Sequence, residues 1–261
     1  MVFSWLRRRR RKKITSQEFP ADWNRIIAAN VAHDARLSDA QQRHLRNFVQ
    51  IFVAETNWEG CHGLKITDEV KVTVAAQAAL LTFNHPNNFF DHVLSVLVYP
   101  DEFIGKDVDV DSDGVVTERQ RRTLGEAMWR GPVVLSWIDV LEGGRREAEG
   151  HNLVLHEFAH QLDMMNGRYV DGIPPLQTRE QLQRWLAVMQ PEYETLVANC
   201  RKRHWGVIDC YGAQNEAEFF SVLVEAFFER SGELRAQHPA AYDLLAGYFA
   251  IDPALWNSGA A

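Results

Sequence analysis

The sequence predicts an α+β fold that is mostly helical and contains a small mixed β-sheet. Two observations lead to this prediction. Apolar residues recur at the spacing of amphipathic helices over most of the chain, with Gly and Pro between the helical stretches. The middle of the chain instead carries three short β-branched runs, at 93–99, 114–117 and 131–137. We therefore expect a small sheet that lies between two helical regions.

Three helices are predicted in the N-terminal region. The first follows Pro20, and the second begins at Ser38, where the Ser-x-x-Gln pattern is a capping box. The third begins at Thr67. Its valines at 70, 72 and 74 alternate as in a strand, but the apolar pattern continues through Leu81 without a turn, which favours a helix.

The third β-branched run, 131–137, has a proline near its start, which is typical of an edge strand. An edge strand beside the functional site would let an extended peptide pair with it, although a purely structural strand explains the pattern equally well. The acidic segment 109–113 begins like a calcium-binding EF-hand loop, but the twelfth position is Gln120 instead of a bidentate glutamate. We interpret this segment as a turn between two strands.

The C-terminal half is predicted to consist of helices joined by loops. The first of these loops is the glycine- and charge-rich segment 142–150. Two helical stretches, 180–189 and 192–203, are expected on either side of Pro191, because proline removes a backbone donor inside a helix. A capping-box-like start at Asn215 opens a further helix that continues to Arg230.

Charge is unevenly distributed along the chain. The whole protein carries a net charge of -7, with 28 Lys and Arg against 35 Asp and Glu. Residues 7–13 are all basic, so the rest of the chain has 21 positive side chains against 35 negative ones, a net charge of -14. So acidic a body is not expected to bind nucleic acid directly.

The basic run also suggests how the chain is divided. We interpret residues 1–18 as a basic flexible tail; the alternative is that its apolar-then-basic tip contacts anionic lipid. Residues 19–256 are predicted to form one domain, with a helical part over about residues 19–90 and a core over about residues 91–256 that carries the functional residues. Residues 257–261 are predicted to be a second tail.

The cysteines, Cys61, Cys200 and Cys210, are odd in number and form no Cys-x-x-Cys pattern, so reduced thiols are predicted. Whether Cys200 and Cys210 approach each other stays open at this point.

No run of about 18 apolar residues is present, so no transmembrane segment is predicted. At the N-terminus the basic run follows the apolar residues, which is the reverse of a signal peptide. We expect a cytoplasmic protein.

Residues 156–160 read His-Glu-Phe-Ala-His, the H-E-x-x-H pattern of zinc hydrolases. Apolar residues around the two histidines predict a helix over this segment, and Gly167 is a suitable stop. Residues four apart lie on one face of a helix, so His156 and His160 can reach the same metal ion. Glu157 lies about 100° further round the helix and faces the open side of the ion, where a general base is needed.

A catalytic zinc ion normally has a third protein ligand. The metzincin extension of the motif would need a glycine and a histidine at positions that hold Asp163 and Asn166, so a separate helix must supply the ligand. Four acids on the helix at 215–230 are candidates: Glu216, Glu218, Glu225 and Glu229. Glu218 and Glu225 lie among large apolar residues, where a carboxylate is costly unless it is paired or metal-bound. They lie about 10.5 Å apart along the helix, so only one can bind the ion, and periodicity leaves both open.

Several separated segments resemble the Mlc titration factor A family of bacterial zinc peptidases. They are 156–163, 130–137, and Tyr211 together with 217–220 and 225–229. The resemblance extends over most of the chain, from about residue 19 to residue 256. Because this family is similar to the anthrax lethal factor protease domain, the resemblance implies a zincin-like metallopeptidase fold.

The resemblance also implies roles for particular residues. Glu218 corresponds to the third ligand of one zinc ion per chain, and Tyr211 corresponds to a tyrosine near the metal that donates to the oxyanion. Zinc-bound water would attack a peptide carbonyl, while Glu157 takes its proton and passes it to the leaving amine. Glu225 or Asp163 would orient a ligand imidazole, or would simply be a solvated or capped acid.

Two classes of function follow. In the first, the protein is a zinc metallopeptidase, which the resemblance makes aminopeptidase-like with short peptides as substrates. In the second, it is a regulatory binding protein that sequesters the transcriptional repressor Mlc and thereby takes part in the control of sugar uptake. The two functions can coexist. The presence of Glu157 favours catalysis, because a protein that only binds a partner needs no general base.

Overall fold

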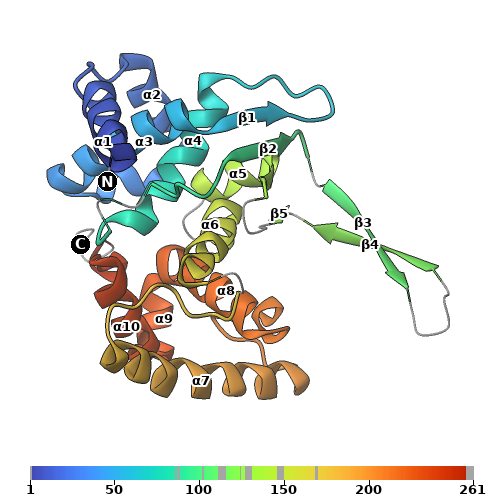
Figure 1. Ribbon diagram of the computed structural model, residues 1–261. Helices are drawn as coiled ribbons and strands as arrows, with labels where there is room; N and C mark the ends of the chain where they lie inside the picture. Colours follow the sequence, from blue (N-terminus) through green and yellow to red (C-terminus); the bar gives the residue numbers. More distant parts are fainter. Residues whose placement is uncertain are drawn as a thin grey trace.

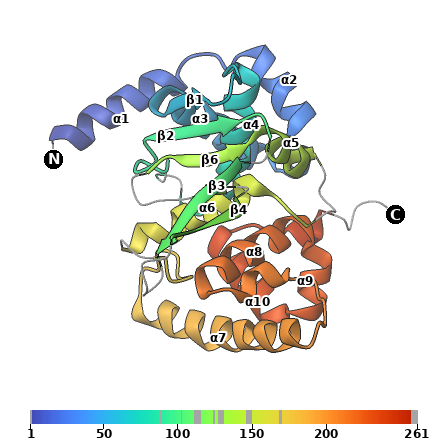
Figure 2. The same cartoon turned by 90° about the vertical axis from the view of Figure 1, so that its right-hand side faces the viewer.

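The computed structural model describes residues 2–85, 87, 89–101, 103–110, 116–123, 125–126, 131–145, 150–167 and 170–256. Its helices form two groups, with helix α6 (Leu153–Asp163) between them (Figures 1 and 2). The first group, α1 to α5, packs around the main β-sheet. The second group consists of α7 to α10. This arrangement confirms the predicted α+β class, mostly helical with a small sheet.

The three helices predicted in the N-terminal region are present as α2 (Ala21–Asn30), α3 (Asp39–Glu55) and α4 (Asp68–Ala79). Ser38 caps α3 with a complete capping box. The Thr67 side chain caps α4 by accepting from the Val70 N–H group. Because α4 is buried on all sides from residue 72 to residue 79, its apolar residues show no one-sided pattern. This is why its valines resemble a strand in the sequence.

Helix α1 (Val2–Thr15) occupies most of the segment predicted as a flexible tail. It packs on α3, and Arg11 holds it there. The Arg11 guanidinium donates to the Glu55 carboxylate at 2.7 Å and also to Asp91, with which Arg7 is paired as well. Both acids are far away in the sequence, so no local pattern indicates this attachment. The prediction of a flexible tail is therefore corrected for residues 2–15.

The main sheet has the strand order β1-β2-β6-β5. Strands β1 (Asn57–Gly60), β2 (Ser95–Tyr99) and β6 (Val133–Ser136) are parallel, and β5 (Gly125–Glu126) is antiparallel to β6. The sheet is therefore mixed, as predicted. Its central pair is held by buried side chains that lie side by side in register, Val96 with Val133 and Val98 with Leu135.

Two details of the predicted sheet are wrong. Strand β4 (Val116–Thr123) does not join it, but pairs with β3 (Phe103–Val110) in a separate two-stranded arm that projects from the body (Figure 1). Strand β6 is not an edge strand at residues 134 and 135, because β5 pairs with it there. Two residues are too few for periodicity to reveal β5. The turn predicted within 109–114 lies largely outside the described residues.

Two helices differ from the prediction, because residues 137–145 were not predicted to be helical and residues 179–201 form one helix where two were expected. Helix α5 (Trp137–Arg145) includes Gly143, and a Cβ atom there would lie 2.9 Å from Cα of Asn152, so the glycine permits close packing against the start of α6. Helix α7 (Arg179–Arg201) continues through Pro191 as one helix. The proline leaves the carbonyl of Ala187 without its N–H partner. Ala187 is exposed, so water can take the place of that donor.

The second group of helices contains α8 (Glu216–Glu229), α9 (Ser231–Gln237) and α10 (Pro239–Phe249) besides α7. Cys200, at the end of α7, forms a disulfide with Cys210 in the 3-10 helix η4 (Cys210–Ala213). The prediction of reduced thiols is therefore wrong for this pair, while Cys61 is a free cysteine. The chain reverses direction after α7, which brings the two cysteines together in a way that spacing cannot show.

Helix α6 is anchored in the hydrophobic core by Phe158, the central residue of the H-E-x-x-H motif. Phe158 is fully buried, and its ring packs edge-on against Phe52 of α3 and Phe90. The motif helix is thereby fixed to the N-terminal group on one side, while its other side faces α8.

Within the residues that the structure describes, no helix is both long enough and apolar enough to span a bilayer.

Candidate metal centre

The candidate site lies where α6 meets α8. Asn152 caps α6: its side-chain oxygen accepts from the Leu155 N–H group at 3.0 Å. Helical spacing then places His156 and His160 on one face, with their ring centroids 4.9 Å apart. The sequence prediction of a helix that presents both imidazoles together is confirmed in its geometry.

Glu218 approaches these imidazoles from the first turn of α8, which Asn215 caps by accepting from the Glu218 N–H group at 2.9 Å. Oε2 of Glu218 lies 3.2 Å from Nε2 of His156 and 3.4 Å from Nε2 of His160. One ligand atom from each of the three residues lies within 4.8 Å of the others. This is the spacing that a single metal ion can bridge.

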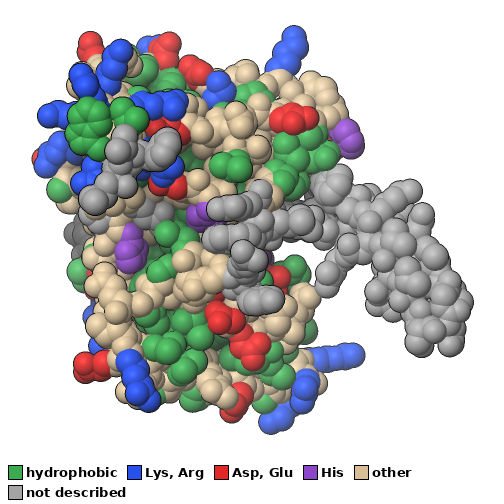
Figure 3. Space-filling view, viewed as in Figure 1, with side chains coloured by type: hydrophobic (Ala, Val, Ile, Leu, Met, Phe, Trp, Pro, Cys, Tyr) green, Lys and Arg blue, Asp and Glu red, His purple; other side chains and the backbone are tan. Residues whose placement is uncertain are grey.

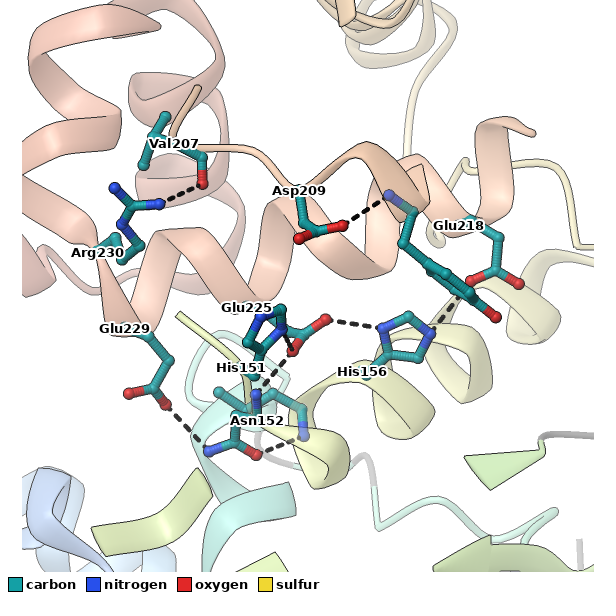
Figure 4. A network of polar contacts seen from close by, with 11 residues as sticks. His151, Asn152, His156, Val207, Asp209, Glu218, Glu225, Glu229 and Arg230 are labelled. Atoms are coloured by element: carbon teal, nitrogen blue, oxygen red, sulfur yellow. Dashed lines mark hydrogen bonds and ion pairs between the residues drawn. The ribbon is translucent and has the colours of Figure 1, made fainter. Parts of the chain in front are cut away.

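The other ring nitrogens of both histidines are engaged from α8. Oε1 of Glu225 lies 2.8 Å from Nδ1 of His156, on the opposite side of the ring from Glu218 (Figure 4). Oγ of Ser221 lies 3.2 Å from Nδ1 of His160. These contacts orient the rings so that both Nε2 atoms are left for the shared position. The sequence left open whether Glu225 or Asp163 would orient a ligand imidazole. In the structure, Glu225 contacts the imidazole of His156 in this way.

Glu225 is itself fixed by the start of the motif helix. Its Oε2 accepts from the Asn152 N–H group at 2.7 Å, and the Asn152 side chain donates to Glu229 at 3.0 Å (Figure 4). Asn152 therefore caps α6 and connects it to two acids of α8. Sequence reasoning missed Asn152 and Ser221 as parts of the site. The only local signal was an asparagine directly before a predicted helix.

Asp163 has a different role from the one considered for it. It is fully buried, and its Oδ2 accepts from the Gly172 N–H group at 2.7 Å, so it holds the loop that follows α6. Burial raises the pKa of the Asp163 carboxyl to about 7, although the backbone hydrogen bonds from Gly172 and Asp171 act in the opposite direction.

The electrostatics of the site favour a cation between the three side chains. Burial raises the pKa of the Glu218 carboxyl, but the hydrogen bonds with His156 and His160 outweigh it and lower that pKa to about 2. For His156, burial lowers the pKa, while Glu218, Glu225 and Glu157 together raise it well above its ordinary value. Several acids thus stabilise positive charge at the place where the imidazoles meet.

The two residues predicted to act in catalysis also lie at this site. Glu157 is on α6, is only 3% exposed, and is near enough to raise the pKa of His156. Tyr211 is in η4, with its ring centroid 5.8 Å from that of His156, and it is 50% exposed. Asp209 caps η4 by accepting from the Tyr211 N–H group at 2.7 Å. The structure therefore brings all five predicted site residues together at the junction of α6, η4 and α8.

The donor set fits a metal ion. Two imidazole nitrogens and one carboxylate oxygen converge, and the remaining nitrogens of both rings are fixed by a carboxylate and a hydroxyl, as is usual for metal-binding histidines. An H-E-x-x-H helix whose histidines meet an acid from a second helix defines the class of metal-dependent peptidases.

Comparison with known proteins identifies the family. The sequence model of the family described as glucose-regulated metallo-peptidase M90 matches residues 4–250, and the chain belongs to this family. It is therefore a metallopeptidase, and its fold is zincin-like. The uncharacterized protein slr2042 of Synechocystis sp. is 35% identical over 245 residues, which cover 94% of this chain and 89% of that protein.

Relatives with a functional name are also found. Mlc titration factor A of Yersinia pestis and that of Yersinia pseudotuberculosis are each 29% identical over 242 residues. These alignments cover 90% of this chain and 86% of each relative. The resemblance inferred from the separated motifs is thus confirmed by similarity over nearly the whole length.

Proposed function

We propose that this protein is a zinc-dependent peptidase that holds one zinc ion per chain through His156, His160 and Glu218. The observation that supports this most directly is the convergence of Nε2 of both histidines with Oε2 of Glu218, at 3.2 and 3.4 Å. Two histidines and one carboxylate are a common ligand set of catalytic zinc in peptidases, with one position left open for water. Zinc bound there would supply Lewis-acid polarisation and a water molecule with a pKa of about 7.

Glu157 is the proposed general base. It shares the motif helix with the two histidines but lies about 100° round from His156, so its carboxylate can serve the open position and not the metal. In this role it takes a proton from the attacking water and delivers it to the leaving amine. Glu157 is only 3% exposed, so its carboxylate is shielded from bulk water.

Tyr211 is the proposed donor to the substrate carbonyl oxygen as negative charge develops there. Its exposure leaves the side chain accessible to a substrate, and its ring lies next to that of His156. The Asp209 cap and the Cys200–Cys210 disulfide fix the start of η4, directly before this residue. Cleavage at the ends of short peptides, as an aminopeptidase, is proposed from the resemblance to the Mlc titration factor A family.

The test combines metal analysis with one substitution. We expect about one zinc per chain in the purified protein. Glu157→Gln is expected to keep the zinc and to lower peptidase activity by about 100-fold or more, because it removes the base but no ligand. Activity is measured on chromogenic aminoacyl substrates and on internally quenched peptides, with and without a chelator. Glu216→Gln, which changes an exposed acid at the start of α8, is the matched control and should leave activity unchanged.

Protein without stoichiometric zinc, or a Glu157→Gln variant as active as the wild type, would overturn the enzyme proposal. Activity on quenched internal peptides without activity on aminoacyl substrates would refute only the aminopeptidase assignment.

A second function is proposed from the relatives named Mlc titration factor A. If this chain titrates a repressor of the Mlc kind, immobilised wild-type protein should retain that repressor, and Glu157→Gln should retain it equally well. Such a result would separate binding from catalysis. Failure of both proteins to retain the repressor would remove this second function and would leave the peptidase proposal intact.

A further inference from the structure

Helix α1 has two faces, and only one of them is used by the fold. Arg7, Arg11, Ile14 and Thr15 lie on the face toward the body, where Arg11 is held by Glu55 and Asp91. Residues four apart share a face of a helix, so Trp5, Arg9 and Lys13 form a row on the opposite side. All three are exposed. The body thus fixes the helix while its outer face stays open.

The tip of the outer face is apolar. Trp5 is 57% exposed and Leu6 is 50% exposed. The Arg9 guanidinium lies 5.5 Å from the centroid of the Trp5 ring, so the indole borders directly on the cationic part of the helix. An exposed tryptophan and leucine side by side, followed by basic residues, is the composition of helices that lie in a membrane interface.

Several basic side chains of α1 take no part in holding the helix on the body. Arg8, Arg9, Lys12 and Lys13 are exposed, and among the residues that the structure describes none of them is in an ion pair. In the space-filling view, Lys and Arg side chains surround exposed apolar side chains over α1, at the upper left (Figure 3). This surface contrasts with the rest of the chain, whose net charge is -14.

A groove beside the helix adds to the basic surface. A cavity of about 770 Å³ lies between α1 and α3, and its lining includes Arg8 and Lys12 from α1 together with His44 and Asn47 from α3. Arg7 and Arg11 also line it, together with Asp91, with which both arginines are paired. Phosphate groups held near the helix would find basic and neutral polar donors there.

We propose that α1 binds the surface of a membrane that contains anionic lipids, and so places this peptidase at that surface. The apolar tip would enter the headgroup region, and the four unpaired cations would contact anionic headgroups. The helix extends outward from the body at its N-terminal end, so it can reach a surface without pressing the acidic body against it (Figure 2). Because nucleic acid offers no apolar layer for Trp5 and Leu6, a bilayer fits this helix better.

The test is co-sedimentation of the full-length protein with vesicles. We expect binding to vesicles of phosphatidylcholine and phosphatidylglycerol to exceed binding to pure phosphatidylcholine by about tenfold or more, and to weaken with added salt. The double variant Trp5→Ser/Leu6→Ser should bind the anionic vesicles about tenfold more weakly. Arg9→Gln/Lys13→Gln should lose a similar factor. All four side chains are exposed, so thermal stability and zinc content should match those of the wild type.

Trp205→Ser/Lys202→Gln is the matched control, because Trp205 is 74% exposed and lies beside exposed cations at the far end of α7. This variant should bind vesicles as the wild type does. Equal binding of the wild type to neutral and anionic vesicles, or undiminished binding by the Trp5→Ser/Leu6→Ser variant, would overturn the proposal. Binding to duplex DNA through the same residues without binding to vesicles would overturn it in favour of a nucleic-acid surface.

Discussion

Glu225 and Glu218 contact opposite nitrogens of one imidazole ring. Oε1 of Glu225 lies 2.8 Å from Nδ1 of His156, and Oε2 of Glu218 lies 3.2 Å from Nε2. One acid therefore fixes the orientation of the ring, while the other shares the open side with His160. From burial and helical spacing alone, either acid could have been the third ligand. Their positions relative to this ring separate their proposed roles.

The first prediction concerns these two acids. Glu218→Ala removes a proposed ligand and is expected to lower zinc affinity by more than 100-fold, whereas Glu225→Ala removes a supporting contact and is expected to lower it by about 10–100-fold. Glu225→Gln keeps an acceptor for the His156 ring and should lie between Glu225→Ala and the wild type. Competition with a chromogenic chelator measures the affinities.

Glu216→Ala is the control for these variants, because Glu216 lies on the same helix but is exposed. It should leave zinc affinity unchanged. A larger loss for Glu225→Ala than for Glu218→Ala would reverse the assignment of ligand and supporting residue.

The second prediction concerns the anchor of the motif helix. Phe158 is fully buried against Phe52 and Phe90, so Phe158→Ala leaves a cavity and should lower the free energy of unfolding by about 3–5 kcal/mol. Met165, at the end of the same segment, is exposed, and Met165→Ala should change that free energy by less than about 0.5 kcal/mol. Urea unfolding of the metal-free proteins gives both values without a contribution from bound metal. Equal stability of the two variants would contradict this account.

Much of the fold could be predicted where local signals were strong. Ser38 and Thr67 mark the starts of α3 and α4 because their side chains satisfy backbone donors that the helix leaves open. Helix α1, strand β5 and the Cys200–Cys210 disulfide could not be predicted, since each depends on a partner that only the fold brings close. Arg11 needs Glu55 and Asp91, and the two residues of β5 need β6.

The site could be predicted in part for the same reason. His156, Glu157 and His160 are a local pattern with a fixed helical geometry, so the sequence placed them on one helix. Glu218 could be selected only by resemblance to a family, because its distance from the histidines is a property of the packing of α8 on α6. Asn152 precedes a predicted helix, which indicates a cap but no contact with Glu225, and Ser221 has no distinctive pattern. Their contacts with Glu225 and His160 appear only in three dimensions.

The third prediction concerns the disulfide. Without reductant, denatured protein should contain one titratable thiol, from Cys61, and after reduction it should contain three. Cys200→Ser opens a short loop and is expected to lower the free energy of unfolding by about 2–3 kcal/mol. Cys61→Ser is the control and should retain the stability difference between oxidised and reduced protein. Three titratable thiols before reduction would contradict the pairing.

The fourth prediction concerns Asp163 and pH. Its buried carboxyl has a pKa raised from 3.8 to about 7, so the folded state holds a proton that the unfolded state releases near pH 4. The stabilisation from this proton is fully present below about pH 4 and is lost as pH rises to about 7. Asp163→Asn is always neutral and keeps an acceptor for the Gly172 N–H group. The measured quantity is the free energy of unfolding of the variant minus that of the wild type, with chelator present. This difference should increase from pH 4 to pH 7 by at most about 4 kcal/mol and then level off. A difference that is constant over this range, or that falls, would show that Asp163 ionises normally in the folded protein.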